Sequence, residues 1–90
     1  MNKIEHHADG HYFELMLEGH RCKLDYTLRD KVMTVTYTGV PNALGGRGLA
    51  AEITKFALDH ARAQGWTVIP QCSYVAAYIK KHPEYTALVN

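Results

Sequence analysis

The stretch VMTVTYTGVPNALGGRGLA, residues 32–50, joins a predicted strand to a predicted helix through a glycine-rich turn. Residues 32–38 alternate apolar and polar side chains, which is typical of a strand with one buried face. Gly45, Gly46 and Gly48 let the backbone turn tightly and leave its amides uncovered by Cβ atoms. Such a turn directs several N–H groups and the positive end of the helix dipole at one place, which suits a phosphate or pyrophosphate. The same glycines also suit an ordinary chain reversal, so the turn by itself leaves both interpretations open.

After the turn the period of apolar residues changes to three and four, which indicates a helix with one buried stripe. The predicted stripe consists of Leu49, Ala50, Ile53, Phe56, Ala57, His60 and Ala61. Gly65 ends this helix, and the apolar run 66–70 predicts a short strand. A strand, a crossover helix and a second strand usually form a parallel pair.

Before residue 32 the chain alternates twice more, over residues 11–18 and 20–28, with Gly19 and the polar turn 29–31 between the segments. Three strands joined by short turns predict an antiparallel meander with one buried face. In the third strand the alternation places Met33, Val35 and Tyr37 on the buried face. It places Thr34, Thr36 and Thr38 on the opposite face.

Ser73 can cap a second helix, which the segment His82-Pro83-Glu84 ends, and residues 85–89 form a short closing element. The predicted order is three strands, a helix, a strand and a helix. This order predicts one α/β (α+β) domain over residues 1–90, with an antiparallel meander followed by helix, strand and helix in a mixed sheet.

Composition sets limits on function. The chain has 90 residues and a net charge of +1, with basic and acidic residues interspersed, which disfavours a nucleic-acid adaptor. It has neither an apolar run long enough to span a bilayer nor a signal-like N-terminus, so we expect a cytoplasmic protein. Cys22 and Cys72 have no metal-binding spacing; a disulfide is possible, and free thiols are expected.

Two motifs carry a resemblance to a known family. The run Val40-Pro41-x-x-Leu44-x-Gly46-x-Gly48-x-Ala50 resembles the acetyl-coenzyme-A loop of the Gcn5-related N-acetyltransferase (GNAT) superfamily, which reads Gln/Arg-x-x-Gly-x-Gly/Ala. Gly48 and Ala50 match its last two places, whereas Gly45 stands where Gln or Arg is usual. Residues 70–85 resemble the C-terminal signature of the short GNAT-like family, so the resemblance covers about residues 10–88.

The resemblance implies a minimal GNAT-like fold that binds acetyl-CoA and transfers its acetyl group to an unidentified amine, of a small molecule or a protein. It implies pyrophosphate binding by the loop amides and a pantetheine arm along the end of the third strand. The implied cofactor-binding residues are Thr38, Val40, Gly45, Gly46, Arg47, Gly48, Leu49 and Ala50. Arg47 could equally be a solvated turn residue. The alternative function is a non-catalytic coenzyme A or acyl-CoA binding module. The sequence does not predict an oligomeric state.

Cys72 and Tyr78 are the candidate catalytic residues. Cys72 lies between a strand end and the first turn of a helix, where the helix dipole lowers a thiol pKa and favours a nucleophilic thiolate. By resemblance, Tyr78 protonates the departing coenzyme A thiolate. The alternatives are that Cys72 is a small buried side chain and that Tyr78 packs on a helix stripe. Tyr74, one turn earlier, is interpreted as a packing residue.

The sequence selects no general base. The short family often has a histidine before the threonine at the end of the third strand, and Tyr37 stands there instead; Glu14 or another strand residue could serve. His6, His7 and His11 are interpreted as surface residues, and no metal site is predicted because no further ligands have suitable spacing. His60 is expected to be partly buried and Cys22 to fill the core.

Overall fold

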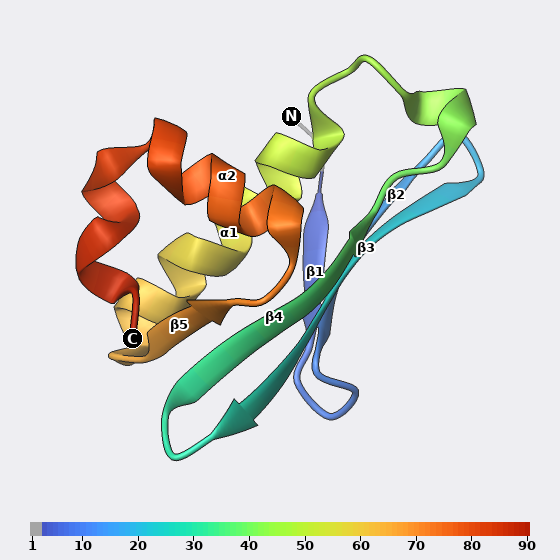
Figure 1. Ribbon diagram of the computed structural model, residues 1–90. Helices are drawn as coiled ribbons and strands as arrows, with labels where there is room; N and C mark the ends of the chain where they lie inside the picture. Colours follow the sequence, from blue (N-terminus) through green and yellow to red (C-terminus); the bar gives the residue numbers. More distant parts are fainter. Residues whose placement is uncertain (1–2) are drawn as a thin grey trace.

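The computed structural model describes residues 3–90, and nine elements follow one another along this part of the chain (Figure 1). The elements are β1 (Ile4–His7), β2 (Tyr12–Leu17), β3 (His20–Arg29), β4 (Val32–Gly39), η1 (Asn42–Leu44), α1 (Leu49–Gln64), β5 (Thr67–Pro70), α2 (Ser73–Lys81) and η2 (Pro83–Leu88).

The strands form one mixed sheet in the order β1-β2-β3-β4-β5. The first four strands are antiparallel, and β5 pairs with β4 in parallel after the α1 crossover, as the sequence predicted. The β2–β3 and β3–β4 hairpins turn at Glu18-Gly19 and Asp30-Lys31, where both residues of each pair have positive φ. Two such residues give a turn whose twist matches that of the flanking strands.

The meander has four strands and not the predicted three, because β1 adds an edge strand to β2. This strand also corrects the interpretation of His6 as a surface residue. The His6 ring is partly buried and stacks on Phe13, with 4.3 Å between ring centroids, and it also contacts His60. Four residues that include a glutamate and two histidines carry too few apolar side chains to show a strand period.

Helix α1 buries a wider arc than the predicted stripe. Thr54 and Leu58 are fully buried in addition to the predicted Ile53, whereas Phe56 is 41% exposed, contrary to prediction. The arc is wide because α1 packs against the sheet on one side and against α2 and η2 on the other. The expected partly buried position of His60 is confirmed.

Helix α2 begins without the predicted serine cap. Its N-cap residue is Cys72, no side chain caps the helix, and Ser73 is the first helical residue. Both helices contribute to a single core with the sheet. Cys22 lies fully buried in that core, as predicted, and both cysteines are free thiols. Among residues 3–90, no helix combines the length and the hydropathy needed to cross a bilayer.

A β-bulge in β4 reverses the predicted inward and outward faces at its end. Asp25 pairs with Tyr37 but the next residue, Tyr26, pairs with Val35, so Thr36 is an extra residue in the ladder. Consequently Tyr37 is 53% exposed, although the alternation predicted it to be buried. Thr38 instead pairs with the buried Leu24 and shares its face, the one that the helices cover.

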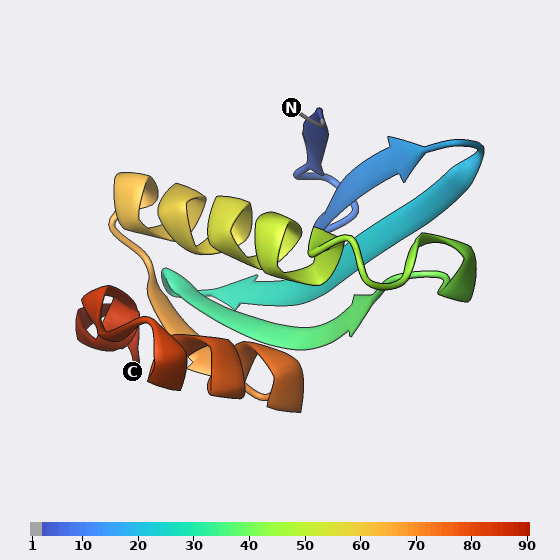
Figure 2. The same cartoon turned by 90° about the horizontal axis from the view of Figure 1, so that it is seen from above.

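Strand β4 also extends beyond its partner β5. Their last paired residues are Val35 and Pro70, and β4 continues to Gly39. Both helices begin at the same end of the molecule, beside the C-terminal end of β4 (Figure 2). The glycine turn, the start of α2 and the unpaired edge of residues 36–39 therefore lie together.

Candidate functional site

The turn before α1 presents a run of backbone N–H groups. Gly46 and Gly48 have φ of 78° and 73°, a left-handed conformation that glycine adopts without strain. Within the described residues, the N–H groups of residues 46–51 donate no hydrogen bond, as expected for a helix start without a side-chain cap. A Cβ atom placed on either glycine would meet no atom within 4 Å, so the space in front of the turn is open.

A cavity of about 230 Å³ lies in front of these amides. Its lining comes from the end of β4 and η1, the glycine turn, the first turn of α1, and Tyr74 of α2: Val40, Pro41, Asn42, Leu44, Gly45, Gly46, Gly48, Leu49, Ala50, Ala51 and Tyr74. Six of the predicted cofactor-binding residues therefore share one cavity (Val40, Gly45, Gly46, Gly48, Leu49 and Ala50).

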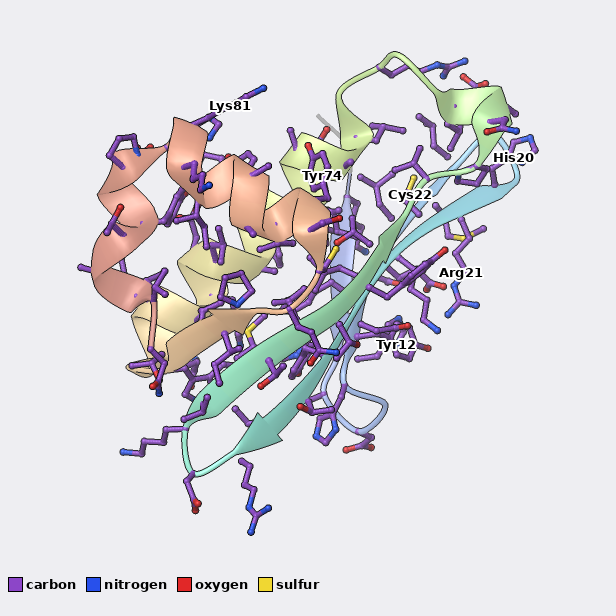
Figure 3. All side chains as sticks on the ribbon, viewed as in Figure 1. Tyr12, His20, Arg21, Cys22, Tyr74 and Lys81 are labelled. Atoms are coloured by element: carbon purple, nitrogen blue, oxygen red, sulfur yellow. The ribbon has the colours of Figure 1, made fainter. Side chains whose placement is uncertain are left out.

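Tyr74 lines this cavity, a position that the sequence interpretation did not predict. It was assigned to packing, but its side chain is 39% exposed and forms one wall of the cavity (Figure 3). The available signal was its place two residues after Cys72, in the first turn of α2, where a side chain faces the same end of the molecule as the glycine turn.

Arg47 does not line the cavity. Its guanidinium forms a two-point ion pair with Glu18 in the β2–β3 turn, with Nη1–Oε2 and Nη2–Oε1 distances of 2.7 and 3.1 Å. The hydrogen bond from Arg47 lowers the pKa of the Glu18 carboxyl, and the same bond raises the pKa of Arg47. Both side chains are exposed, so the pair ties the glycine turn to the sheet without burying charge.

Cys72 lies against the bulged end of β4. Its N–H donates to the Val35 carbonyl at 2.8 Å, and its Sγ is 3.7 Å from Thr38 Oγ1. Burial raises the pKa of the thiol, but hydrogen bonds from the Val75 amide, the Thr38 hydroxyl and the Tyr74 amide outweigh this effect. The net pKa of Cys72 is therefore lower than that of an ordinary thiol, as a helix N-terminus predicts. By contrast, burial raises the pKa of Cys22, with the nearby Glu52 adding to the effect.

Tyr78 has a different environment. The ring is only 8% exposed and stacks on His82 with 4.0 Å between centroids, and the Tyr85 ring lies 6.1 Å away. Burial raises the pKa of the Tyr78 hydroxyl. A raised pKa keeps the phenol protonated at neutral pH, as a proton donor must be. In the described residues, no hydrogen bond joins the side chains of Tyr78 and Cys72.

Glu14 lies away from this cavity. It sits on the face of β2 opposite the helices, and its carboxylate is bound by Arg21 Nε at 2.7 Å and His7 Nε2 at 3.1 Å. Figure 3 shows Arg21 on that outer side of the sheet, whereas Tyr74 lies on the helix side. A position across the sheet from Cys72 does not suit a base for chemistry at that thiol.

Comparison with known proteins gives concordant matches. The family model described as GCN5-related N-acetyl-transferase matches residues 12–88. Protein NATD1 of Mus musculus and that of Homo sapiens are each 31% identical over 84 residues, which cover 90% of this chain and 76% and 74% of those proteins. The solution structure of a GCN5-like protein from Staphylococcus aureus matches with a TM-score of 0.75 and 22% identity, covering 98% of this chain and 87% of the other.

Proposed function

The chain belongs to the GCN5-related N-acetyltransferase family, and from that premise we propose that it binds acetyl-CoA and transfers the acetyl group to an amine. The observation that carries the proposal is one arrangement at the open end of the sheet. Backbone N–H groups that donate no hydrogen bond border the cavity, and the Cys72 thiol, whose pKa is lowered, lies nearby. The end of β4 contacts both, because Val40 lines the cavity and Thr38 contacts Cys72.

The residues at this end fit the substrate. The pyrophosphate would accept hydrogen bonds from the N–H groups of residues 46–51, whose number and common direction suit an anion with several oxygens. The amide-bearing pantetheine arm would extend along residues 38–40, where β4 has no β5 partner. Gly45 supplies no side chain at its position, so the backbone provides the binding there.

Cys72 would act as the nucleophile. Its thiolate attacks the carbonyl carbon of the acetyl thioester, a new carbon–sulfur bond forms, and the bond to coenzyme A sulfur breaks. The departing coenzyme A thiolate takes a proton from a phenol. The acceptor amine then attacks acetyl-Cys72, the bond between the acetyl carbon and Sγ breaks, and Cys72 returns to its thiolate. The proton that the amine loses passes through solvent to the phenolate, which restores the phenol. This route accounts for a chain in which Tyr37 replaces the histidine base and Glu14 faces the other side of the sheet.

Two tyrosines can supply the proton. Tyr78 is the donor that the family resemblance implies, and its raised pKa keeps it protonated. Tyr74 lines the cavity itself, and burial raises its pKa as well. Separate Tyr74→Phe and Tyr78→Phe variants assign the role, because removal of the general acid slows turnover by roughly a hundredfold or more.

The test is incubation of the whole chain with acetyl-CoA followed by intact mass measurement. We expect an adduct of one acetyl group that is absent in Cys72→Ser and present in Cys22→Ser, the matched control with a buried thiol of raised pKa. Thr38→Val keeps the side-chain shape and removes the hydroxyl near Sγ, so it should slow adduct formation.

Two other results distinguish the alternatives. Acetyl transfer to an amine with no adduct, undiminished in Cys72→Ser, would exclude the covalent route while preserving the enzyme. Coenzyme A binding with neither adduct nor transfer to any amine tested would favour the non-catalytic module. The buried, ring-stacked position of Tyr78 is the observation that favours that second function.

A further inference from the structure

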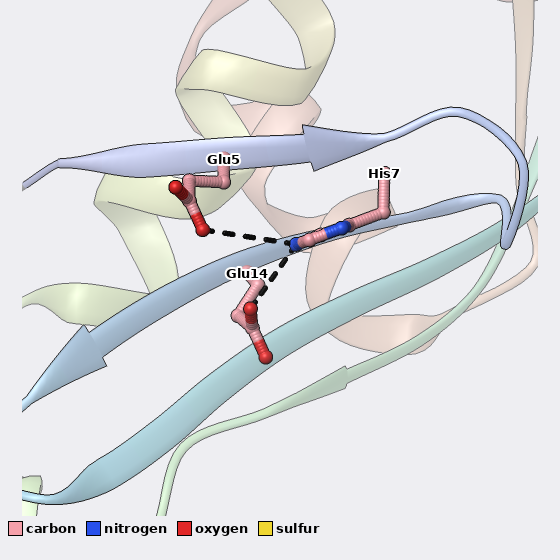
Figure 4. A group of neighbouring side chains, drawn as sticks. All are labelled: Glu5, His7 and Glu14. Carbon is pink, nitrogen blue, oxygen red and sulfur yellow. Dashed lines mark hydrogen bonds and ion pairs between the residues drawn. The ribbon is translucent and has the colours of Figure 1, made fainter.

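The outer face of the sheet carries a group of metal-ligating side chains far from the cavity. Glu5 and His7 are two residues apart on β1 and therefore share a face, and Glu14 pairs with Glu5 across the β1–β2 ladder (Figure 4). The sequence interpretation found no further ligands spaced around His7. The missing ligand, Glu14, comes from the neighbouring strand, and only the strand register brings it close.

We propose that Glu5, His7 and Glu14 form a binding site for a zinc ion. Their ligand atoms all lie within 4.8 Å of one another. His7 Nε2 is 3.1 Å from Glu14 Oε1 and 3.9 Å from Glu5 Oε1. Ligand atoms about 2.0–2.2 Å from a tetrahedral zinc ion are roughly 3.3–3.6 Å apart, so small rotamer changes would place all three around one ion.

Neighbouring side chains hold two of the ligands in the required orientation. Arg21 Nε binds the second oxygen of Glu14, Oε2, at 2.7 Å, which leaves Oε1 directed at His7. The Tyr12 ring stacks on His7 with 4.6 Å between centroids and an interplanar angle of 19°, which fixes the imidazole plane. Such outer partners orient the ligands of protein metal sites.

The donor set and its exposure indicate the kind of ion and site. One imidazole nitrogen and two carboxylate oxygens suit Zn²⁺, which is bound by nitrogen and oxygen ligands in four-coordinate sites. The Glu14 side chain is 16% exposed, whereas that of Glu5 is 52% exposed. The fourth position therefore opens to solvent and would be filled by water. The ion would link β1 to β2 and so stabilise the edge strand.

The test is calorimetric titration of the EDTA-treated and dialysed whole chain with ZnCl₂, together with its melting temperature with and without the ion. Cys72→Ser serves as the background because a free thiolate can bind zinc itself. We expect one zinc ion per chain, a higher melting temperature, and at least about a tenfold loss of affinity in His7→Gln and in Glu5→Gln.

The controls make the result decisive. His20→Gln, which removes an exposed histidine outside the group, should keep the full zinc affinity. Glu5→Gln is the critical variant, since Glu5 is exposed and its loss should leave the fold intact. The absence of saturable zinc binding, or equal affinity in Glu5→Gln and the background protein, would overturn the proposal and leave His7 and Glu14 as an ordinary ion pair. None of these measurements depends on acetyl transfer.

Discussion

The two ends of α1 are built alike and differ in what they leave unpaired. Both are marked by glycine in the left-handed conformation, Gly48 with φ 73° at the start and Gly65 with φ 74° at the finish. At the finish, the Gly65 N–H donates to Arg62 O at 3.1 Å and the Trp66 N–H to Ala61 O at 2.9 Å, which closes the last turn. At the start, the N–H groups of residues 46–51 donate to nothing in residues 3–90.

Side chains repeat the contrast. At the finish, the His60 ring contacts Trp66 and His6, and Tyr85 donates to Asp59 at 2.6 Å. At the start, three glycines, Tyr74 and mostly aliphatic side chains surround an open cavity. A left-handed glycine therefore does not indicate function by itself. What distinguishes a binding site is whether the polar groups that the turn exposes find partners within the chain.

The largest expected effect is a difference in coenzyme A affinity between valine substitutions at Gly48 and at Gly65. Valine at either position is strained, so Gly48→Val and Gly65→Val should each lose roughly 1–2 kcal/mol of unfolding free energy in urea. Only Gly48→Val should also weaken coenzyme A binding, since Gly48 lines the cavity and Gly65 does not. Loss of one hydrogen bond to a charged group corresponds to a roughly tenfold to hundredfold fall in affinity.

Calorimetric titration with coenzyme A measures that difference. Equal affinity in the two variants would mean that the open amides are not the phosphate site, and the contrast between the ends would then lose its functional meaning.

A second prediction concerns pH at the closed end. Burial lowers the pKa of His6, and the nearby His60, His7 and His11 lower it further. The folded state therefore favours the neutral imidazole, and this stability is present above the unfolded-state pKa of about 6.5 and lost as pH falls through the lower folded value. His6→Phe, which retains a ring to stack on Phe13, should lose less stability than the wild type between pH 7.5 and 5.5 in urea unfolding.

His20→Gln is the matched control. It should lose as much unfolding free energy between pH 7.5 and 5.5 as the wild type, since His20 is exposed at the other end of the sheet. If His6→Phe lost as much unfolding free energy as the wild type over this pH range, another group would be responsible for the pH dependence. Coenzyme A affinity at pH 7.5 should be the same in all three proteins, because His6 lies outside the cavity.

The smallest effect concerns the ion pair beside the open end. The Arg47–Glu18 pair is exposed, so neither Arg47→Ala nor Glu18→Gln should change the melting temperature appreciably. If Arg47 can turn to a coenzyme A phosphate, Glu18→Gln should raise the affinity several-fold and Arg47→Ala should lower it, with both changes diminishing at high salt. If the two variants and the wild type bind coenzyme A with the same affinity, Arg47 does not contact the ligand and serves only to tie the glycine turn to the sheet.

Most of the fold could be predicted from periodicity. The three strands from residue 11 onward, the crossover helix and the parallel β5 are all present, because each has a face that must be buried. Strand β1 was missed because its stability comes from pairing and from rings packed across the sheet. The burial of Leu58 was not predicted, because the predicted apolar stripe assumed that α1 packs against the sheet alone. Helix α1 also packs against α2.

The parts of the candidate site that depend on local backbone structure could be predicted from the sequence. The parts that depend on tertiary contacts were harder to predict. The glycine turn and the position of Cys72 at a helix start follow from local sequence. The contact between Cys72 and Thr38 joins residues 34 positions apart, and the alternation pointed Thr38 to the wrong face. The exposure of Tyr74 to the cavity was not predicted, because a position in a helix does not show whether another element covers the side chain.

The extra residue in β4 makes the surroundings of the Cys72 thiol depend on the pairing register of the strand. If Thr36 paired with Asp25 in a regular ladder, every residue would keep its place in the sequence, yet Tyr37 would turn inward opposite Leu24 and Thr38 would turn outward. Cys72 would then lose its hydroxyl neighbour although neither residue had been changed. A comparison of relatives that scores only residue identities would miss such an event, whereas the pairing register of β3 with β4 would reveal it.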